Sequence, residues 1–257
     1  MKAPSFAYAK PRSLAEAFEL LDRPGAQVLA GGQSLIPSLN LRLSAPELLV
    51  DITGLPGLAK IERRDGSLRV GALCTHAGLE RSAEVKEHVP LVAEAIPHIA
   101  HPAIRNRGTL GGSLALADPA AELPACAVAL DAVVVTCGRD GERRVKATDF
   151  FKGLFETDLR AGEVLVAVEF PKAEKSVFLE LTRRHGDYAI VGVAAVKKGA
   201  ERRFAFFGLG GKPILLRPRS LEDGKTSLPA PAADLYHSAP TKLHLAKVLL
   251  ERAWNKL

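Results

Sequence analysis

Two pairs of adjacent glycines, about eighty residues apart, are the features of this chain best suited to bind an anion. The first lies in Ala30-Gly31-Gly32-Gln33-Ser34 and the second in Thr109-Leu110-Gly111-Gly112-Ser113. Glycine has no Cβ and tolerates positive φ, so its backbone can come close to a phosphate. Successive main-chain N–H groups in such a turn form an anion-binding concavity, and a following helix adds partial positive charge. Two such segments can hold one pyrophosphate from both sides, although a single glycine pair is also typical of an ordinary tight turn.

Other motifs that would carry chemistry fail at a required position. Gly208-Leu209-Gly210-Gly211 begins like a dinucleotide-binding fingerprint, but Pro213 takes the place of its last glycine. Gly224-Lys225-Thr226 resembles the end of a P-loop without the upstream glycine. His98 and His101 have no evident further ligands for zinc, which favours surface or packing roles. The sequence also lacks Gly-x-Ser-x-Gly, so serine-hydrolase chemistry has no support.

The composition is that of an ordinary globular protein with a mild positive charge. Among 257 residues, 35 Lys and Arg stand against 29 Asp and Glu, giving a net charge of +6. Aromatic residues make up only 5% of the chain, so base-stacking platforms for nucleic acid are poorly supplied. We therefore expect no nucleic-acid partner, and the basic character suits an anionic cofactor or an acidic protein partner.

The three cysteines, Cys74, Cys126 and Cys137, share no short spacing that would ligate a metal or build a disulfide framework. A reducing cytoplasm is the expected setting. The chain begins without a signal-peptide pattern, and no apolar run reaches membrane-spanning length. Methionine, asparagine and glutamine are scarce, which is typical of a thermophilic source, with a high-GC mesophile as the competing explanation.

The elements before the second glycine pair follow from periodicity and end signals. Ser13-Leu14-Ala15-Glu16 is a capping box, and it predicts a helix that Pro24-Gly25 ends. A short buried strand over 28–30 leads into the first pair, where open α/β sheets bind ligands. Beyond it the pattern predicts a helix over 34–43, strands over 48–52 and 68–73, and a helix over 89–99 despite Pro97.

After the second pair, strands dominate the prediction. The sequence predicts a β-branched strand over 128–136, a hairpin turn over 139–142, and strands over 163–170, 177–182, 189–196 and 204–209. The proline-rich stretch 213–231 is predicted as a loop. A last helix over 238–257 has Ser238 or Thr241 as its cap, and its core-facing side chains are Leu245, Leu249, Ala253 and Trp254.

Several sequence blocks together carry a family resemblance. They are Leu29 to Pro37, Ile104 to Leu114, Ala117 to Pro124, Asp149 to Gly153 and Arg183 to Gly192. In this order, from residue 1 to about 200, they resemble the flavin-binding medium subunit of the molybdenum hydroxylases. That family contains the aerobic carbon monoxide dehydrogenases and xanthine dehydrogenase.

The resemblance implies an α+β fold with two domains. Residues 1–171 would form an FAD-binding domain of the vanillyl-alcohol-oxidase type, with two α/β subdomains split near residue 55 and FAD between them. Residues 172–257 would form the family's C-terminal domain, a small antiparallel sheet plus helices.

The resemblance also assigns the FAD contacts. They fall on both glycine segments and on four positions beyond them, namely Leu29, Ala30, Gly31, Gly32, Gln33, Ser34, Leu35, Thr109, Gly111, Gly112, Ser113, Asp118, Glu122, Leu165 and Tyr188. Main-chain donors and hydroxyls of the glycine segments would hold the pyrophosphate and ribityl chain, and Tyr188 would lie by the isoalloxazine ring. Leu165 would contact the adenine or the flavin through its backbone.

Three of the assigned residues, Asp118, Glu122 and Gln33, and two nearby arginines can also be interpreted from their own chemistry. Asp118 and Glu122 are four apart and share one face if their segment is helical, with helix capping as the alternative. Gln33 predicts dissociable FAD, because an amide cannot form the covalent flavin bond that a histidine forms in related flavoproteins. Arg105 and Arg107 are either solvated surface charges or contacts to a partner or cofactor phosphate.

The function implied is electron relay within a larger complex, without catalytic residues in this chain. A large subunit carrying the molybdenum cofactor would oxidise the substrate, and a small subunit with two [2Fe-2S] clusters would pass electrons singly to FAD. The three chains would form a heterohexamer, and the flavin would reduce NAD, oxygen, quinone or another acceptor. The absence of cysteine ligands for a cluster agrees with this division of labour.

Two alternatives and two departures accompany the resemblance. A self-sufficient flavin oxidase or reductase would need an acid or base, for which His76, His101 and His185 are the candidates. A scaffold protein that has lost FAD conflicts with the intact glycine pairs. Residues 199–238 form a shorter stretch than is usual in the family, and Leu179-Glu180 stand where a lysine is common.

Overall fold

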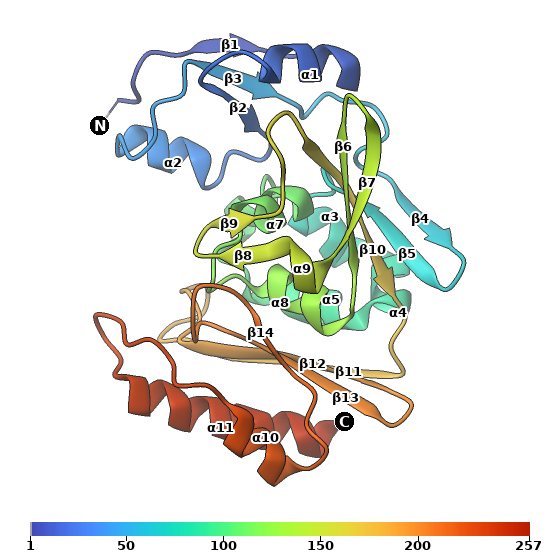
Figure 1. Cartoon of the computed structure of the whole chain (residues 1–257), viewed down its shortest axis with the longest axis vertical. Helices are drawn as coiled ribbons and strands as arrows, with labels where there is room; N and C mark the ends of the chain where they lie inside the picture. The colour runs from blue at the N-terminus through green and yellow to red at the C-terminus, as the bar shows by residue number, and fades with distance from the viewer. Residues whose placement is uncertain (1) are drawn as a thin grey trace.

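The chain forms four β-sheets, and three of them follow one another along the long axis of the molecule (Figure 1). The computed structural model describes residues 2–257. The N-terminal sheet lies at one end and the C-terminal helices at the other, with a large mixed layer between them. The fourth sheet is a small hairpin of β8 (Phe151–Gly153) and β9 (Glu156–Thr157).

The N-terminal sheet is parallel and leads into the first glycine pair. Its strands lie in the order β1 (Ala7–Ala9), β3 (Leu48–Asp51) and β2 (Ala26–Leu29). The glycines connect β2 to α2 (Leu35–Asn40), which ends before the predicted residue 43. Arg42 has φ +58°, and this left-handed conformation cannot continue an α-helix.

The predicted capping box is confirmed at α1 (Leu14–Leu21). The Ser13 hydroxyl accepts from the Glu16 N–H at 3.2 Å. The Glu16 carboxylate accepts in return from the N–H of Arg12 at 2.7 Å, one residue before the cap. Two unpaired donors at the helix start are thereby satisfied.

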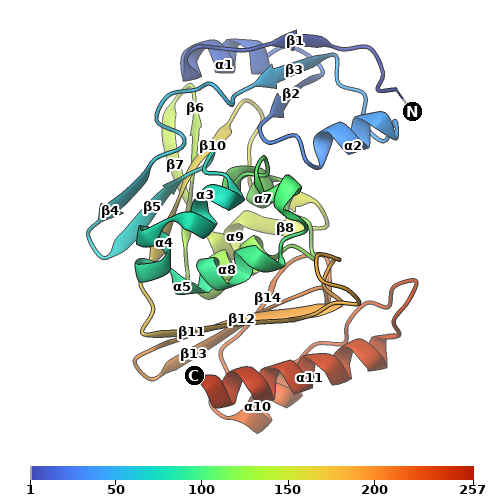
Figure 2. The same cartoon turned by 180° about the vertical axis from the view of Figure 1, so that it is seen from behind.

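The middle sheet has five antiparallel strands. Their order is β4 (Ile61–Arg64), β5 (Ser67–Gly71), β10 (Val164–Pro171), β6 (Val133–Gly138) and β7 (Gly141–Lys146). Its helices are α3 (His76–Arg81), α4 (Ala83–His88), α5 (Pro90–Ala95), α6 (Pro102–Arg105), α7 (Leu110–Leu116), α8 (Glu122–Ala129), α9 (Ala147–Phe150) and the 3₁₀ turn η1 (Ile96–His98) (Figure 2).

Two predictions in this layer were wrong in part. The strand predicted over 128–136 begins only at Val133, because Val128 and Ala129 complete the buried helix α8. A short apolar run is ambiguous between buried helix and strand, and tertiary burial selected the helix here. The helix predicted over 89–99 ends at Ala95, since Pro97 lacks an N–H and the chain tightens into η1.

The C-terminal sheet is antiparallel, as predicted. It consists of β11 (Lys175–Leu181), β12 (Val191–Lys198), β13 (Glu201–Phe207) and β14 (Ile214–Leu216). α11 (Ala239–Lys256) covers one face, with the predicted Ser238 as its cap. Leu249 and Ala253 are buried in the core between them, and Leu245 and Trp254 pack against it. The other face meets α5 and α8 of the middle layer.

The stretch 213–231 is not the loop that its prolines predicted. It contains β14, which pairs with β13, and α10 (Leu221–Ser227), capped by the Ser220 hydroxyl. Gly224-Lys225-Thr226, the tripeptide reminiscent of a P-loop, therefore lies inside a helix. Within residues 2–257, no helix combines the length and apolar composition needed to cross a membrane.

Candidate flavin site

The two glycine segments touch each other in the structure. We call residues 30–35 the first glycine segment and residues 108–113 the second. A Cβ added to Gly31 would lie 2.1 Å from the carbonyl oxygen of Arg107 and 3.0 Å from the Cα of Gly108. Only a glycine permits this approach of two backbones. The two segments therefore lie together, as binding one pyrophosphate from both sides requires, and each leads into a helix, α2 (Leu35–Asn40) or α7 (Leu110–Leu116) (Figure 2).

The first segment keeps its main-chain donors free. Gly32 has φ +73°, and the turn it makes directs the chain into α2. Within the described part of the chain, the N–H groups from Gly31 to Ser34 donate to no protein acceptor. The one side-chain bond of this segment runs from Gln33 Nε2 to the carbonyl of Gly31 at 3.0 Å. A row of unpaired N–H groups beside a positive-φ glycine is the geometry of an anion site.

The second segment uses its main-chain donors within the protein. The N–H of Leu110 donates to Cys74 O at 3.0 Å, and that of Gly111 donates to Ala72 O at 2.8 Å. The N–H of Gly112 donates to the Thr109 hydroxyl at 3.1 Å, which caps α7. The hydroxyl of Ser113 has no partner among the described residues and stays available.

Two arginines, Arg105 and Arg107, immediately precede the second segment. Arg105 is buried, and its guanidinium donates to Glu80 at 3.2 Å and to the carbonyls of Pro97, Ile99 and Ala100. A solvated surface charge is therefore wrong for Arg105, whereas contact of its remaining nitrogen with a partner or cofactor stays a prediction. Arg107 is exposed.

His76 lies directly beneath the segment. Its ring is buried beside Gly108, and neither ring nitrogen has a hydrogen-bond partner in the described chain. Burial lowers the pKa of His76 to about 4, with the nearby Arg105 charge acting in the same direction. The imidazole is therefore neutral at pH 7.

Asp118, Glu122 and Tyr188 come together beyond α7. The segment from Asp118 is not helical, and Asp118 instead accepts from the Ala120 N–H at 2.9 Å in the turn before α8. Asp118 does not cap α8 either, because the N-cap of that helix is Ala121 and no side chain accepts from its first turn. Tyr188 has a side chain that is 74% exposed. Partial burial of its hydroxyl, and after it the charges of Asp118 and Glu122, raise the pKa of Tyr188.

Glu122 is buried at the first turn of α8, with 8% of its surface exposed. Burial raises the pKa of Glu122 to about 8, and the charges of Glu180 and Asp118 add to the effect. A desolvated carboxyl that faces other carboxyls keeps its proton at neutral pH. At pH 7 the Glu122 side chain is therefore mainly a neutral acid, which can donate a hydrogen bond.

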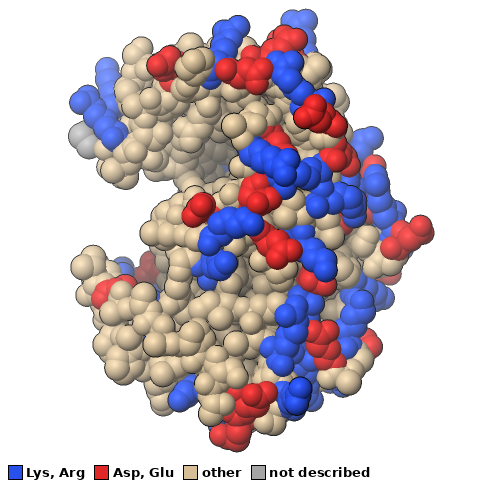
Figure 3. All heavy atoms as spheres, in the orientation of Figure 1, with Lys and Arg blue, Asp and Glu red and all other residues tan. Residues whose placement is uncertain are grey.

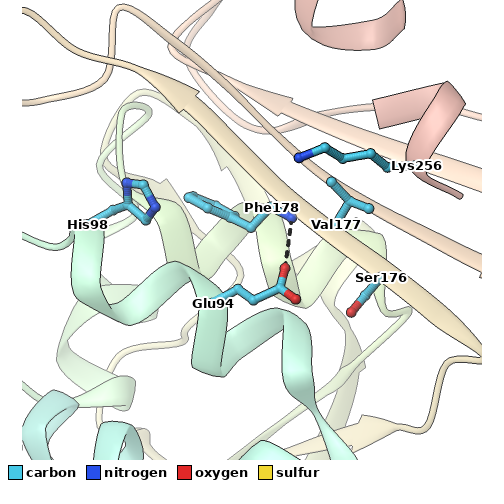
Figure 4. Close-up of a pocket in the computed structure, with 6 residues that line it drawn as sticks. All are labelled: Glu94, His98, Ser176, Val177, Phe178 and Lys256. Atoms are coloured by element: carbon cyan, nitrogen blue, oxygen red, sulfur yellow. Dashed lines mark hydrogen bonds between the residues drawn. The ribbon is translucent and has the colours of Figure 1, made fainter. Parts of the chain in front are cut away.

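Glu180 and His98 are site neighbours that the sequence did not predict. Glu180 lies on β11, and its carboxylate meets His98 Nδ1 at 3.3 Å. The side chain of Glu180 is only 2% exposed. His98 lines a pocket together with Glu94, Ser176, Phe178 and Lys256, and its ring packs against Phe178 (Figure 4). The alternation of β11 could have revealed Glu180, because Phe178 and Glu180 share the face of that strand toward the middle layer.

Leu165 comes from β10, whose next residue, Val166, accepts from the N–H of Ala72, the residue that accepts from Gly111. It is a buried residue of β10, paired with Thr136 of β6, and its side chain belongs to the core of the middle layer. Its backbone role toward a cofactor stays a prediction.

Metal-binding geometry is not found within residues 2–257. No group of three or more His, Cys, Asp and Glu side chains there is arranged to hold a metal ion. Cys74, Cys126 and Cys137 are free thiols.

Comparison with known proteins assigns the family. A model of the FAD-binding domain in molybdopterin dehydrogenase matches residues 4–173. The chain belongs to this family. The resemblance read from the sequence blocks is thereby confirmed, and the chain is an FAD-binding medium subunit of the molybdenum hydroxylase type, an oxidoreductase component.

Relatives in this family are similar over most of the chain. The 6-hydroxypseudooxynicotine dehydrogenase complex subunit alpha of Paenarthrobacter nicotinovorans is 43% identical over 87% of this chain and 78% of that protein. The carbon monoxide dehydrogenase medium chain of Hydrogenophaga pseudoflava is 33% identical over 99% of this chain and 98% of its own.

A solved structure confirms the fold. A chain of quinoline 2-oxidoreductase from Pseudomonas putida 86 superposes with a TM-score of 0.93 at 38% identity, covering 100% of this chain and 98% of that one. The predicted α+β fold with a sheet-rich C-terminal part is therefore correct.

Proposed function

We propose that this chain holds FAD without a covalent bond and relays electrons from the [2Fe-2S] clusters of a small partner subunit to an external acceptor. The observation that carries the proposal is the pair of touching glycine segments, one of which presents unpaired N–H groups. The family match supports FAD as the ligand that these donors bind.

The residues present fit such a cofactor. The N–H groups from Gly31 to Ser34 and the hydroxyls of Ser34 and Ser113 would bind the pyrophosphate and ribityl oxygens. The remaining proposed contacts are Leu29, Ala30, Leu35, Thr109, Gly111, Gly112, Asp118, Glu122, Leu165 and Tyr188. Because the N–H groups of Gly111 and Gly112 are already paired, the second segment contributes mainly shape and hydroxyls.

Bound FAD supplies the ability to collect electrons singly and release them as a pair. The chain's own residues bind it, orient it and set its potential. For a two-electron couple, about 30 mV corresponds to about 1.4 kcal/mol. A single hydrogen bond, worth about 0.5–1.5 kcal/mol, is therefore enough to shift the potential. Gln33 cannot form the covalent bond, so desalting after denaturation should release FAD.

We propose a division of the chain at residue 171, with an FAD-binding part over 1–171, itself split near 55, and a C-terminal part over 172–257. In support, β10 ends at Pro171, and all four strands of the last sheet come after it. The N-terminal parallel sheet is complete by Asp51.

Exposed apolar side chains support a role as one subunit of a larger assembly. They lie at α2, at the β8–β9 turn and before α11, and are Ile36, Leu41, Leu43, Leu154, Phe155, Leu235 and Tyr236. These segments lie on the left of Figure 1, whereas the charged residues of Figure 3 gather mainly on the opposite side. Exposed apolar surface of this kind marks protein partners. We propose a heterohexamer with large molybdenum and small iron–sulfur subunits, in a reducing cytoplasm.

The histidines give little support to the alternative of a self-sufficient flavin oxidase or reductase. His76 is buried and neutral, while His101 and His185 are exposed. The relatives are subunits of dehydrogenase complexes, which does not favour either an autonomous oxidase or a scaffold.

The test is the visible absorption spectrum of the purified chain before and after addition of FAD and desalting. Retained flavin bands that acid releases as free FAD would support the proposal. A colourless chain that retains no added FAD, alone or with co-expressed small and large subunits, would overturn it.

A further inference from the structure

A pocket at one end of the C-terminal sheet is lined mainly by cationic side chains. Its volume is about 430 Å³, and its walls come from the β12–β13 turn, the segment after β14 and the last turns of α11. In both views of the chain, this turn lies beside the C-terminal end of α11 (Figure 1, Figure 2). The charged residues that line the pocket are Lys197, Glu201, Arg202, Arg217 and Arg219. The cations therefore outnumber the single carboxylate.

The strand register places two of these cations directly opposite each other. Lys197 of β12 pairs with Arg202 of β13, so both side chains leave the same face of the sheet. That face is the one that α11 covers, because Phe204, two residues after Arg202, belongs to the core beneath α11. Like charges directly opposite on neighbouring strands are destabilising. Within residues 2–257 neither side chain forms a salt bridge, so an anion between them would remove an uncompensated repulsion.

Aromatic packing holds one of the two cations in place. The guanidinium of Arg202 lies over the indole of Trp254, with its Cζ 4.2 Å from the ring centroid. The same indole stacks on Phe204, with 5.8 Å between the ring centroids. A guanidinium held flat against a ring keeps its edge N–H groups free, and such groups bind phosphate oxygens in pairs. Because the indole already packs against two groups, the pocket recognises phosphate oxygens rather than a nucleobase.

The segment after β14 adds two further arginines. The Nε of Arg217 lies 3.0 Å from the Glu201 carboxylate, so these two charges neutralise each other. Arg219 is exposed, and its backbone N–H donates to the Asp223 carboxylate at 2.8 Å in the turn before α10. Its guanidinium has no acceptor in the part of the chain that the structure describes. With the two cations of the strand pair, the pocket therefore holds three positive charges without a protein counter-charge.

We propose that this pocket binds a small oligophosphate anion through Lys197, Arg202 and Arg219. Three unpaired cations need several negative charges in a small volume, and an oligophosphate concentrates its charge in this way. The bound anion would tie the β12–β13 turn to the segment after β14. The glycine segments precede α2 and α7, nearer to the N-terminal end of the molecule, so this is a separate site (Figure 1). The inference goes beyond the proposed function and does not require bound FAD.

The experiment uses the fluorescence of Trp254, which is the single tryptophan of the chain and lines the pocket. The full chain, with and without FAD, is titrated with inorganic triphosphate in the absence of divalent cations. We expect a saturable change in tryptophan emission that weakens as the salt concentration rises. Arg219→Ala, which leaves the indole and its packing partners unchanged, should weaken the affinity about tenfold, because one charge-assisted contact is lost.

Arg183→Ala is the matched control, since it removes one positive charge from an exposed arginine that lies over Tyr236 instead. It should keep the wild-type affinity. Absence of a saturable change in the wild type, or equal affinity in Arg219→Ala and Arg183→Ala, would overturn the proposal. Lys197→Gln is a second variant, on the opposite wall of the pocket, and should also weaken binding about tenfold.

A parallel titration with ATP identifies the group that is recognised. Affinity equal to that of inorganic triphosphate would support recognition of the phosphate chain alone. Binding of ATP about tenfold tighter than that of inorganic triphosphate would overturn that assignment, because the base or ribose would then contribute. A chain that binds no FAD even with its partners would defeat the proposed function and leave this site standing, since the titration without FAD tests the pocket by itself.

Discussion

The two glycine segments look alike in the sequence but differ in the structure. In the second, the N–H groups of Leu110, Gly111 and Gly112 all donate to protein oxygens, and a Cβ on Gly111 would lie 2.6 Å from that of Ala72. In the first, the N–H groups of the glycines have no protein acceptor. One segment is therefore a support fixed to the middle layer, and the other, leaning on it through Gly31, offers donors to a ligand. The same residue type serves close packing in one place and ligand approach in the other.

The largest effect is expected for Gly31→Ala, which tests the contact between the two segments. The added methyl would meet the Arg107 carbonyl at 2.1 Å, a backbone atom that cannot simply rotate away. We expect the segments to separate, with a loss of about 3 kcal/mol in the free energy of unfolding and at least a tenfold loss in FAD affinity. Denaturant unfolding and FAD titration measure the two effects. Gly210→Ala is the control, because its methyl would make only an ordinary contact at 3.7 Å. Equal FAD affinity in Gly31→Ala and wild type would show that the contact between segments is not needed.

Lowering the pH should destabilise the second segment, because His76 beside it becomes protonated. Its pKa lies below the ordinary 6.5, at about 4, so the unfolded chain binds the proton more tightly. The contribution of neutral His76 to the free energy of unfolding is therefore fully present above pH 6.5, and it is lost as the pH drops toward 4. The loss in the free energy of unfolding is at most about 3 kcal/mol, because each tenfold change in proton affinity corresponds to about 1.4 kcal/mol.

Denaturant unfolding between pH 7 and 4 checks this, with His76→Gln expected to flatten the decline relative to wild type. His185→Gln, which alters an exposed histidine, should keep the wild-type slope. An unchanged slope in His76→Gln would mean that this ring does not couple the segment to pH.

A smaller effect is expected for Gly32→Ala in the first segment. Its φ of +73° is unfavourable for alanine by about 1–2 kcal/mol, while the nearest atoms, on Ile36 and Leu29, belong to side chains that can adjust. FAD affinity should fall by about tenfold, because a turn that relaxes no longer aligns its N–H groups. Calorimetric FAD titration measures the change. A loss confined to stability, with normal affinity, would place the ligand elsewhere.

The smallest effect is expected for Ser113→Ala. The hydroxyl has no protein partner, so the free energy of unfolding should stay within about 0.5 kcal/mol of wild type. FAD binding should weaken by about 0.5–1.5 kcal/mol, the usual value of one hydrogen bond. Thr109→Ala provides the contrast, since removal of that cap should lower stability by about 1 kcal/mol. If Ser113→Ala leaves FAD affinity unchanged, the second segment contributes shape alone.

Local signals predicted much of the fold. The capping box at Ser13, the cap at Ser238 and the hairpin after β6 all depend on residues within a few positions of each other, and all are present. The errors came where burial overrides local pattern. Val128 and Ala129 are helical because α8 is enclosed on all sides, and the proline-rich stretch gained β14 because β13 offers it an edge.

The sequence by itself determined the glycine pairs, the amide at Gln33 and the acidic residues after α7, because residue types and short spacings are local properties. These residues were enough to indicate the family and a pyrophosphate-binding turn. Only the tertiary structure decided which segment has free N–H groups, since the acceptors for Leu110 and Gly111, on Cys74 and Ala72, lie more than thirty residues away. It also decided that Glu122 is buried within reach of the Glu180 charge from another element. The proton affinity of a carboxyl depends on burial and on neighbouring charge, and both are set by residues that the chain brings together from distant positions.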